Sequence, residues 1–534
     1  MPRSTIPYHE TGYYSKLITD YLSEAEALQQ FYQRFPKITN FNAQLSEKKK
    51  QFSDASREAL VEQLHKQYAN TEVSEATQKN IDALANENTF TITTGHQLNL
   101  FTGPLYFLYK IFSVINLAET LNKSNTNSYM VPVFWMATED HDFEEINYFN
   151  FKGKKIQWNR QSSGAVGMLE TVGLEEVFQV IEAQFGKSEN AKHLLSIFKQ
   201  GYLEHTSLAE ATRFIANTLF SDYGLVIIDG NDKELKKQFI PFAEKEINQQ
   251  LSFSAITETT VRLNKLGYPE QVHPREINLF YLKENLRERI VQRDDLFFIT
   301  ETDIRFTRNE ILDELKAHPE RFSPNALLRP LYQEVILPNL CYVGGGGELA
   351  YWFQLKDYFN EVEVIFPILL LRNSVLLVPD RLSEKLDKLE VEVSDLFLKQ
   401  HELTTKHTKK ISDIAIDFSS QRAHLEQQFK ALYELAEKTD ASFVGAVAAQ
   451  EKKQLNGLDK LEKRLLKAQK RKLADELERL TTIQDQLFPK QSLQERNSNF
   501  AEFYLEYGQE LFNQLKDQLD PLLHEFTLLR LPKP

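Results

Sequence analysis

Two short polar clusters in the first third of the chain contain residue types that are suited to catalysis. Thr94-Gly95-His96 follows the β-branched run from Phe90 to Thr93. Glu139-Asp140-His141-Asp142 follows the apolar run from Met130 to Met136. A glycine at a strand end lets the backbone approach a phosphate or an acyl group closely, and a histidine beside it can donate to charge that develops there. Carboxylates and imidazoles perform acid–base chemistry or hold polar substrates.

The second cluster also contains residue types that ligate metals, so a metal site is an alternative. Adjacent residues at one strand end do not all face the same way, however, and no distant His or Cys pair is matched to this cluster. We therefore expect polar substrate binding or general acid–base work at this cluster, and no metal.

A third candidate is the run of four glycines from Gly344 to Gly347, which is followed by Glu348. The run resembles a phosphate cradle, but it matches neither the GxGxxG pattern of dinucleotide-binding proteins nor the GxxxxGKS pattern of P-loops. A nicotinamide-dependent or P-loop enzyme is therefore not expected. We predict instead that the glycines let the chain pass close beside a ligand, with Glu348 facing a substrate amine. The single cysteine, Cys341, lies in an apolar run and is interpreted as a buried structural thiol.

Alternating strands and helices must position these clusters. Phe90 to Thr93 and Met130 to Met136 fit strands that are buried on both faces, and the helical stretch from Leu105 to Leu121 has the length of a βαβ crossover. The carboxyl ends of the two strands then lie at one edge of a parallel sheet, where ligands usually bind. Further core strands are predicted at Gly224 to Gly230 and Asn339 to Val343, and Val362 to Phe366 with Ile368 to Leu371 should give one or two more. The predicted fold class is therefore α/β.

The rest of the chain is predicted to divide around this core. Residues 1–85 form an amphipathic helical segment packed on the core, which spans 86–379 and carries insertions at about 143–220 and 231–330. The first insertion should begin with a β-hairpin between Ile146 and Trp158.

The remaining residues favour a coiled coil. Leucines at heptad spacing from Leu382 to Leu403, a helix at about 421–435 and a Leu/Lys/Glu-rich stretch from Lys452 to Leu487 predict an antiparallel arm over 380–490. Its longest helix should measure roughly 50 Å. Residues 491–534 are predicted to be helical and to return to the core.

Composition limits the class of protein. The net charge of -13 and the isoelectric point near 5.6 argue against a protein that binds nucleic acid through bulk basic charge. No stretch approaches about 18 uncharged apolar residues, the first residues lack a signal-peptide core, and one cysteine cannot form an internal disulfide. We therefore expect a cytoplasmic protein that contacts neither a membrane nor nucleic acid.

Six segments share their residues with one known family: Thr94 to Gln97, Leu100 to Tyr106, Val131 to Trp135, Glu139 to Asn147, Gly344 to Glu348 with Tyr351, and Gln494 to Asn497. Nearly from end to end, the chain resembles the BshC family of cysteine-adding enzymes in bacillithiol biosynthesis. The resemblance implies a Rossmann-like core with two connecting-peptide insertions, a coiled-coil domain and a homodimer that forms through it. It also implies a ligase that adds L-cysteine to the amine of glucosaminyl-malate in the last step of the pathway.

Such a core is similar to that of nucleotidyltransferases and class I aminoacyl-tRNA synthetases, whose first strand ends in a Thr/His-x-Gly-His signature. Thr93-Thr94-Gly95-His96 fits this signature. The second signature of those enzymes, a Lys-Met-Ser-Lys-Ser loop, is not present, and Arg372-Asn373-Ser374 is its nearest counterpart. The similarity of the core implies ATP or ADP as the cofactor, whereas the missing second signature counts against direct ATP use. Whether ATP is used and how the cysteine carboxyl is activated are left open.

The implied reaction is amide formation between the cysteine carboxyl and the sugar amine. His96 and nearby glycine backbone would stabilise the activated carboxyl or its phosphate, Asp140 or His141 would accept the amine proton, and Glu348 would hold the cysteine ammonium. The other implied substrate-binding positions are Thr94, Gln97, Thr102, Gly103, Tyr106, Glu139, Asp142 and Tyr351. The implied nucleotide-binding positions are Gly95, Gly344, Gly345, Gly346, Gly347, Arg372, Ser374 and Arg496.

Two other classes of protein stay open. A non-enzymatic coiled-coil scaffold whose Rossmann-like body senses a nucleotide or a thiol metabolite is compatible with the long arm and the missing second signature. An RNA-modifying or tRNA-charging relative is disfavoured by the acidic charge and by the lack of a basic, aromatic-lined face. Salt-dependent binding to RNA would revive that class.

Overall fold

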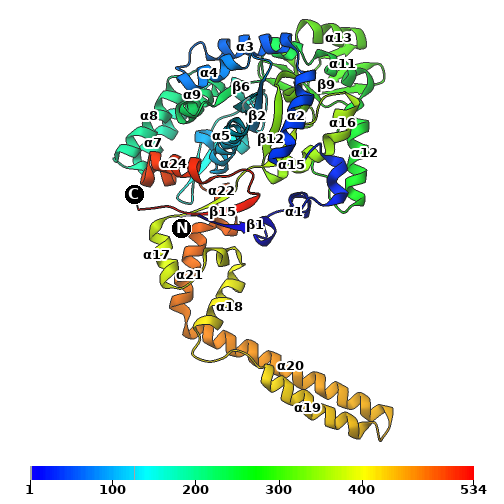
Figure 1. Cartoon of the computed structure of the whole chain (residues 1–534), viewed down its shortest axis with the longest axis vertical. Helices are drawn as coiled ribbons and strands as arrows, with labels where there is room; N and C mark the ends of the chain where they lie inside the picture. The colour runs from blue at the N-terminus through cyan, green and yellow to red at the C-terminus, as the bar shows by residue number, and fades with distance from the viewer. Residues whose placement is uncertain (1–2, 126, 534) are drawn as a thin grey trace. The chain divides into compact units, whose positions relative to one another are not determined.

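The computed structural model describes residues 3–125 and 127–533, and Figure 1 shows their helices and strands. The chain forms two compact units. The larger unit runs to Leu377 and resumes from Gln494 to Pro532, and the smaller unit runs from Val378 to Leu493. Within the described residues, no helix is both long and apolar enough to cross a membrane.

A five-stranded parallel sheet forms the centre of the larger unit. Its strand order is β13-β12-β2-β3-β6, with bounds Ile368–Leu371, Asn339–Gly344, Thr89–His96, Tyr129–Met136 and Val226–Asp229. β2 and β3 pair in register as far as His96 and Met136, so both polar clusters leave the sheet at the same level. Both strands are buried along almost their whole length, which explains their apolar and β-branched sequences. The predicted parallel α/β core is confirmed.

Helices cover this sheet. The crossover helix α5 (Tyr106–Ser124) packs on β2 and β3, as predicted. From the N-terminal segment, α2 (Ile38–Gln51) contacts β12, and α3 (Asp54–Tyr68) and α4 (Glu75–Ala83) contact β6.

A separate three-stranded sheet corrects the prediction for both ends of the chain. β1 (Arg3–Pro7) pairs antiparallel with β15 (Glu525–Arg530), which lies beside β14 (Val375–Val378). The N-terminal and C-terminal segments are therefore not wholly helical. Of the one or two strands predicted over Val362 to Phe366 and Ile368 to Leu371, one forms, which is β13 at Ile368–Leu371. Short strands depend on partners far away in the sequence, which a local pattern does not reveal.

Two insertions interrupt the core. The first contains the predicted hairpin, β4 (Tyr148–Phe151) with β5 (Lys154–Gln157), and then α7 (Leu174–Phe185), α8 (Glu189–Leu203) and α9 (Leu208–Phe220). The second contains α10 (Lys233–Lys237), α11 (Ile240–Gln249), α12 (Leu251–Lys265) and an antiparallel sheet in the order β10-β9-β8-β7-β11. The strands β7 to β11 are Leu279–Lys283, Leu286–Arg293, Leu296–Ile299, Arg305–Thr307 and Phe322–Pro324. α14 (Arg329–Ile336) precedes β12, and α15 (Gly346–Trp352) follows it.

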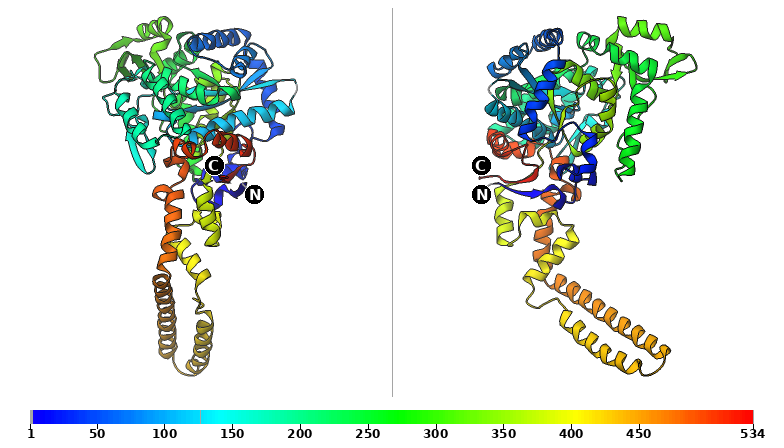
Figure 2. Two further views of the ribbon diagram at one scale, coloured as in Figure 1. Left: turned by 90° about the vertical axis from the view of Figure 1, so that its left-hand side faces the viewer. Right: turned by 45° about the vertical axis from the view of Figure 1, so that its right-hand side comes forward.

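The smaller unit is helical. α19 (Ser419–Ala436) lies beside α20 (Ala441–Lys472) in an antiparallel hairpin (Figures 1 and 2). The predicted seam from Leu382 to Leu403 is not one helix, because a 3-10 turn at Val393–Phe397 separates α17 (Asp380–Lys388) from α18 (Gln400–Ile411). The predicted helix from Lys452 to Leu487 breaks at Leu473, where α21 (Ala474–Leu487) begins. Leucine spacing indicates which side of a helix is buried, not where the backbone turns.

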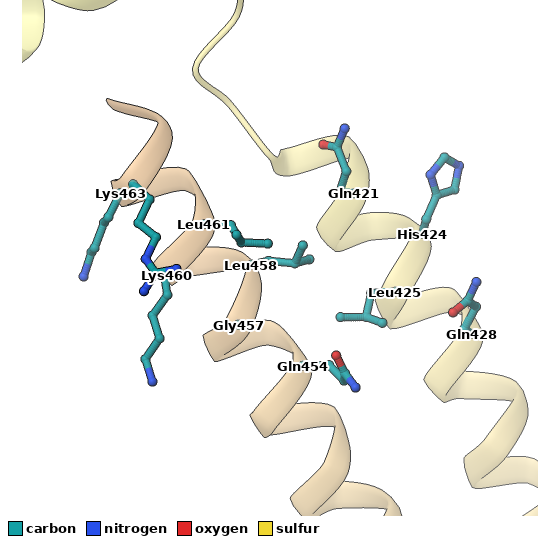
Figure 3. Close-up of a pocket in the computed structure, with 11 residues that line it drawn as sticks. Gln421, His424, Leu425, Gln428, Gln454, Gly457, Leu458, Lys460, Leu461 and Lys463 are labelled. Carbon is teal, nitrogen blue, oxygen red and sulfur yellow. The ribbon is translucent and has the colours of Figure 1, made fainter. Parts of the chain in front are cut away.

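An open groove of about 760 Å³ runs between α19 and α20. Figure 3 shows that Leu425 and Leu458 face each other in the groove, whereas Lys460 and Lys463 point away from it. No cluster of polar side chains converges on one point in this view, so we interpret the groove as a packing surface of the coiled coil.

Candidate active site

A cleft of about 420 Å³ lies at the carboxyl ends of β2 and β3. This edge of a parallel sheet gathers helix N-termini and unpaired backbone groups, which bind anions and polar ligands. The predicted site residues that line the cleft are Gly95, His96, Gln97, Tyr106, Glu139, Asp140, Gly345, Gly347, Glu348, Tyr351, Arg372 and Arg496. The structure therefore brings together motifs that are up to several hundred residues apart in the sequence.

The other predicted site residues do not line the cleft: Thr94, Thr102, Gly103, His141, Asp142, Gly344, Gly346 and Ser374. Thr94 is buried in the sheet, where its hydroxyl donates to the Val343 carbonyl at 2.7 Å. Ser374 is also buried and donates to the Glu495 carboxylate at 3.3 Å. The hydroxyls of Thr94 and Ser374 are therefore bonded within the protein, and the structure does not support the predicted contacts of these side chains with a ligand.

Two of the predicted glycines are required by the packing of the protein itself. A Cβ atom at Gly103 would lie 2.6 Å from the Cβ of Asn99, and one at Gly344 would lie 2.9 Å from the Tyr342 ring. Gly346 faces Ile18, whose side chain would be 3.4 Å from an added Cβ. The glycine run thus presents only Gly345 and Gly347 to the cleft, and the predicted ligand contacts of the other glycines are corrected.

Glu348 is held by the protein itself. Its carboxylate accepts hydrogen bonds from the Tyr342 hydroxyl at 2.9 Å and the Gly345 amide at 2.7 Å, and it lies 2.7 Å from Nζ of Lys110. Burial would raise the pKa of Glu348, but the charge and hydrogen bond of Lys110 hold that pKa below its usual range. A carboxylate whose charge is already matched is poorly suited to hold the cysteine ammonium, so the structure does not support that predicted role.

The sequence analysis missed Lys110. Its side chain on α5 is only 4% exposed, and its ammonium also donates to the carbonyl of Gly95 at 2.6 Å. Lys110 therefore ties the end of β2 to the first turn of α15. A lone lysine in an otherwise apolar helix was the available signal, because a buried ammonium requires a partner.

Asp140 remains an anion in the cleft. Its carboxylate accepts a hydrogen bond from Gln97 at 3.1 Å and from the backbone amide of His141 at 2.8 Å. Burial would raise the pKa of Asp140, but the hydrogen bonds from His141 and Gln97 outweigh burial and lower it to about 2. Such a weak base suits an ammonium better than it suits the predicted uptake of a proton. Glu139 also lines the cleft, but it is paired with Lys236.

His141 lies beside a cation that sequence reasoning did not find. The guanidinium of Arg287, on β8, is 2.6 Å from Nδ1 of His141. Ligand atoms of Asp140, His141 and Asp142 lie within 4.8 Å of one another, as in some metal sites. A metal ion there would be close to the guanidinium charge, so the arrangement does not favour a metal. Because His141 does not line the cleft, its predicted role as proton acceptor is not supported either.

Arg372 reaches the cleft with its charge already balanced. Two of its nitrogens contact the carboxylate of Glu495 at 2.8 and 3.1 Å, and the two side chains are 4% and 1% exposed. Glu495 therefore occupies the two terminal nitrogens of Arg372, whereas Nε has no partner among the described residues, so the predicted nucleotide contact of Arg372 stays a prediction that only Nε could fulfil without displacing Glu495. The pattern around Arg372 alone could not reveal a partner that is 123 residues away.

In the described part of the chain, three cations of the cleft have no ion pair with a carboxylate: Arg287, which contacts His141, and Arg329 and Arg496. Arg329 at the start of α14, which the sequence analysis missed, donates to the Gln333 side chain at 3.0 Å and lies 5.6 Å from the centre of the Tyr342 ring. Arg496 is exposed at the rim. Cations without a carboxylate partner make the cleft suitable for an anionic ligand.

His96 is neutral in the folded protein. Burial, helped by the nearby Lys110 charge, lowers the pKa of His96 to about 3. One ring nitrogen makes a hydrogen bond with the Thr102 backbone, whereas Nε2 has no partner among residues 3–125 and 127–533. A neutral imidazole that donates one N–H to a carbonyl has an unprotonated second nitrogen. Nε2 of His96 is therefore an acceptor, and this arrangement does not support the predicted donation from His96 to negative charge.

Both units match known sequences. Residues 1–373 match the family "Bacillithiol biosynthesis BshC, N-terminal Rossmann-like domain", and residues 375–531 match "Bacillithiol biosynthesis BshC, C-terminal coiled-coil domain". Curated relatives from Christiangramia forsetii, Flavobacterium johnsoniae and Flavobacterium psychrophilum each carry the name "Putative cysteine ligase BshC". They are 58%, 54% and 54% identical to this chain, and each alignment covers 99% of this chain and 99% or 100% of the relative.

Proposed function

Because the chain belongs to the BshC family of bacillithiol biosynthesis, we propose that it is a ligase that joins the carboxyl group of L-cysteine to the amine of glucosaminyl-malate in the last step of that pathway. The names of the relatives support the ligase class and the cysteine substrate. The family resemblance of the motifs suggests the second substrate, and the charges of the cleft support it.

The charge pattern of the cleft is the observation that carries this proposal. Arg329 and Arg496 offer two cations without carboxylate partners among the described residues, and Asp140 offers an ionised carboxylate. Glucosaminyl-malate has a complementary pattern, because its malyl group carries two carboxylates and its sugar carries an amine. We assign Arg496 to the malyl group, Asp140 to the sugar amine, and Arg329 to the anion at the cysteine carboxyl.

The reaction forms a bond between the amine nitrogen and the carboxyl carbon of cysteine. The bond from that carbon to the activated oxygen breaks, so that this oxygen leaves with its activating phosphate group, and the proton lost by the nitrogen passes to solvent water. Asp140, with a pKa of about 2, and His96, with a pKa of about 3, are weak bases at neutral pH. We therefore assign the chain's contribution to orientation and charge, since holding two reactants in line can supply a large part of a rate enhancement.

The resemblance implies ATP as the source of the activated carboxyl, and two glycines of the cleft fit a phosphate. A Cβ atom at Gly347 would meet no atom within 4 Å, and one at Gly95 would meet none closer than 3.5 Å. Packing of the protein does not require glycine at these positions, whereas close approach of a ligand to the backbone would. Arg329 would hold a phosphate beside Gly95. A bound ATP would supply the phosphoryl or nucleotidyl group that activates the cysteine carboxyl.

We also propose that two copies of the chain associate through the coiled coil, as the resemblance implies. On α20, Phe443 and Leu461 are 43% and 52% exposed, which leaves apolar surface available to a second copy. Light scattering on the full chain should give the mass of a dimer, and Leu461→Glu should shift it toward the monomer. A monomer at micromolar concentration would contradict this association.

Mass spectrometry of the products tests the ligase activity. Purified protein with L-cysteine, glucosaminyl-malate and ATP should form the cysteine adduct, and deletion of the gene should remove the adduct from cells while glucosaminyl-malate accumulates. If no adduct forms and the cellular thiol pool is unchanged, the ligase proposal fails and a sensing scaffold becomes the better explanation.

A further inference from the structure

A second, much smaller cavity lies next to the cleft, and His96 and Gln97 line both. Its volume is about 10 Å³, and its polar lining also includes Asn99, Thr102 and Thr212. Thr212 belongs to α9, in the first insertion, whereas His96 ends β2 and Gln97, Asn99 and Thr102 belong to the segment that follows it. A cavity of roughly this volume accommodates one water molecule when at least two polar groups face it.

Four polar atoms in the lining of this cavity are buried and have no hydrogen-bond partner in the described ranges: Nε2 of His96, Oδ1 of Asn99, Oγ1 of Thr102 and Oγ1 of Thr212. The great majority of buried polar side-chain atoms have a partner, because an unpaired one is costly. Four such atoms around a cavity of water size therefore point to a ligand that bonds to all of them.

The donors and acceptors of this lining match a single water molecule. Asn99 donates through its amide nitrogen to the carbonyl of Glu145 at 3.3 Å, which leaves its side-chain oxygen as an acceptor. Nε2 of His96 is a second acceptor, because the ring is neutral and its other nitrogen is bonded to the Thr102 backbone. The hydroxyls of Thr102 and Thr212 can donate. A water would thus receive two hydrogen bonds and give two.

The backbone next to the cavity is strained, which is an independent sign that its geometry is required. Phe101 and Thr102 have φ values of 46° and 65°, in the left-handed region that a β-branched residue rarely adopts. The Tyr202 hydroxyl accepts from the Phe101 amide at 2.8 Å, and Asn499 donates to the carbonyls of Phe101 and Gly103 at 2.8 and 2.6 Å. These bonds hold the turn that brings Thr102 to both His96 and the cavity.

We propose that this cavity binds one structural water molecule, and that Asn99, Thr102 and Thr212 are positioning residues that act on His96 through it. The water keeps the imidazole in a single orientation with Nε2 unprotonated. Since Gln97 lines the same cavity and donates to Asp140 at 3.1 Å, the water also supports the wall of the cleft beside the amine site. Only the effect on turnover rests on the proposed function.

Substitutions of one threonine test this site in the full chain. Thr212→Val removes the hydroxyl at nearly constant volume, and Thr212→Ser keeps it. Thr218→Val is the matched control, because Thr218 is exposed on the same helix. A high-resolution crystal structure and the ¹⁵N resonances of the His96 ring report the water and its hydrogen bond without any turnover.

We expect one ordered water within hydrogen-bond distance of Nε2 of His96 in the unsubstituted protein, in Thr212→Ser and in Thr218→Val. In Thr212→Val the water should be lost, the Nε2 resonance should move downfield, and kcat/KM should fall about tenfold, as expected for one lost hydrogen bond. Absence of the water from the unsubstituted protein, or an unchanged Nε2 resonance in Thr212→Val, overturns the inference even if the adduct forms. If the water is present but no adduct forms, the proposed function fails and the water site stands.

Discussion

Nζ of Lys110 lies 2.7 Å from the Glu348 carboxylate, and this ion pair joins the helix after β2 to the helix after the glycine run. The two side chains are 4% and 28% exposed. Lys110→Met leaves a mostly buried carboxylate without a counter-charge, so the free energy of unfolding should fall by about 3 kcal/mol. Urea denaturation followed by circular dichroism measures this change.

The double variant Lys110→Met/Glu348→Gln separates charge from packing. It should regain most of the lost stability, because no unpaired charge remains. Lys123→Met on the same helix is the control. Nζ of Lys123 lies 3.9 Å from the Glu119 carboxylate, and the lysine side chain is 81% exposed. The free energy of unfolding should therefore change by no more than about 0.5 kcal/mol. Equal stability of the single and double variants would show that packing of the lysine stem dominates.

Arg496→Ala should weaken binding of glucosaminyl-malate without unfolding the protein. A charged hydrogen bond is worth about 1.5 to 3 kcal/mol, so KM should rise roughly 10- to 100-fold. Lys187→Ala removes the same charge from an exposed position outside the cleft and should leave KM unchanged. Glucosamine lacks the malyl group, so its slow turnover should be the same in Arg496→Ala and in Lys187→Ala. If Arg496→Ala impaired the use of glucosamine as much as the use of glucosaminyl-malate, this would count against the assignment of Arg496 to the malyl group.

Two glycines near the cleft should respond to alanine in opposite ways. A Cβ atom at Gly167 would lie 2.6 Å from the Cβ of Thr138, so Gly167→Ala should lower the free energy of unfolding by about 2 kcal/mol. At Gly95 the nearest atom would be the Tyr342 hydroxyl at 3.5 Å, so Gly95→Ala should fold with nearly unchanged stability. Its ligand affinity should nevertheless fall at least tenfold, since the methyl group would occupy the space of a bound phosphate. Calorimetry of unfolding and of ATP binding gives both values, and full ATP affinity in Gly95→Ala would place the nucleotide elsewhere.

The succession of strand, helix and strand that begins the core could be predicted because it depends on local sequence patterns. Continuous apolar runs indicated β2 and β3, and helical spacing indicated α5, so the polar clusters were correctly placed at one sheet edge. The direction of each side chain was harder to predict. Thr94 and Gly95 are adjacent in β2, yet Gly95 lines the cleft with His96 at the end of the strand, whereas the Thr94 hydroxyl is buried in the sheet against the Val343 carbonyl.

The partners of charged residues could not be predicted for a different reason. No ion-pair partner for Glu348 or Arg372 could be identified from the sequence. In the structure, Glu348 pairs with Lys110 and Arg372 pairs with Glu495. Each pair joins distant segments that only the folded sheet brings together. The sequence pattern therefore indicated where the site lies, whereas the ion-pair partners of its charged residues could be identified only from the structure.

The depressed pKa of Asp140 predicts how stability depends on pH. Its pKa is about 2 in the folded protein and close to 3.8 in an unfolded chain, so folding favours the ionised form. The stabilisation is therefore present above about pH 4 and is lost as the pH falls through 2. A shift of this size corresponds to roughly 2.5 kcal/mol, which we reduce to about 1 to 2 kcal/mol because the side chain is 28% exposed.

Asp140→Asn isolates this contribution from the other acids that titrate in the same range. The variant should be about 1 to 2 kcal/mol less stable than the unsubstituted protein at pH 7, and the difference should shrink toward zero between about pH 4 and pH 2. Asp142→Asn is the control, because that carboxylate is 54% exposed and should contribute less than about 0.5 kcal/mol. Urea denaturation at a series of pH values measures both differences. A constant difference for Asp140→Asn down to pH 2 would mean that the carboxylate is not held in its ionised form by Gln97 and His141, and Asp140 would then lose its role as the anion that holds the substrate amine.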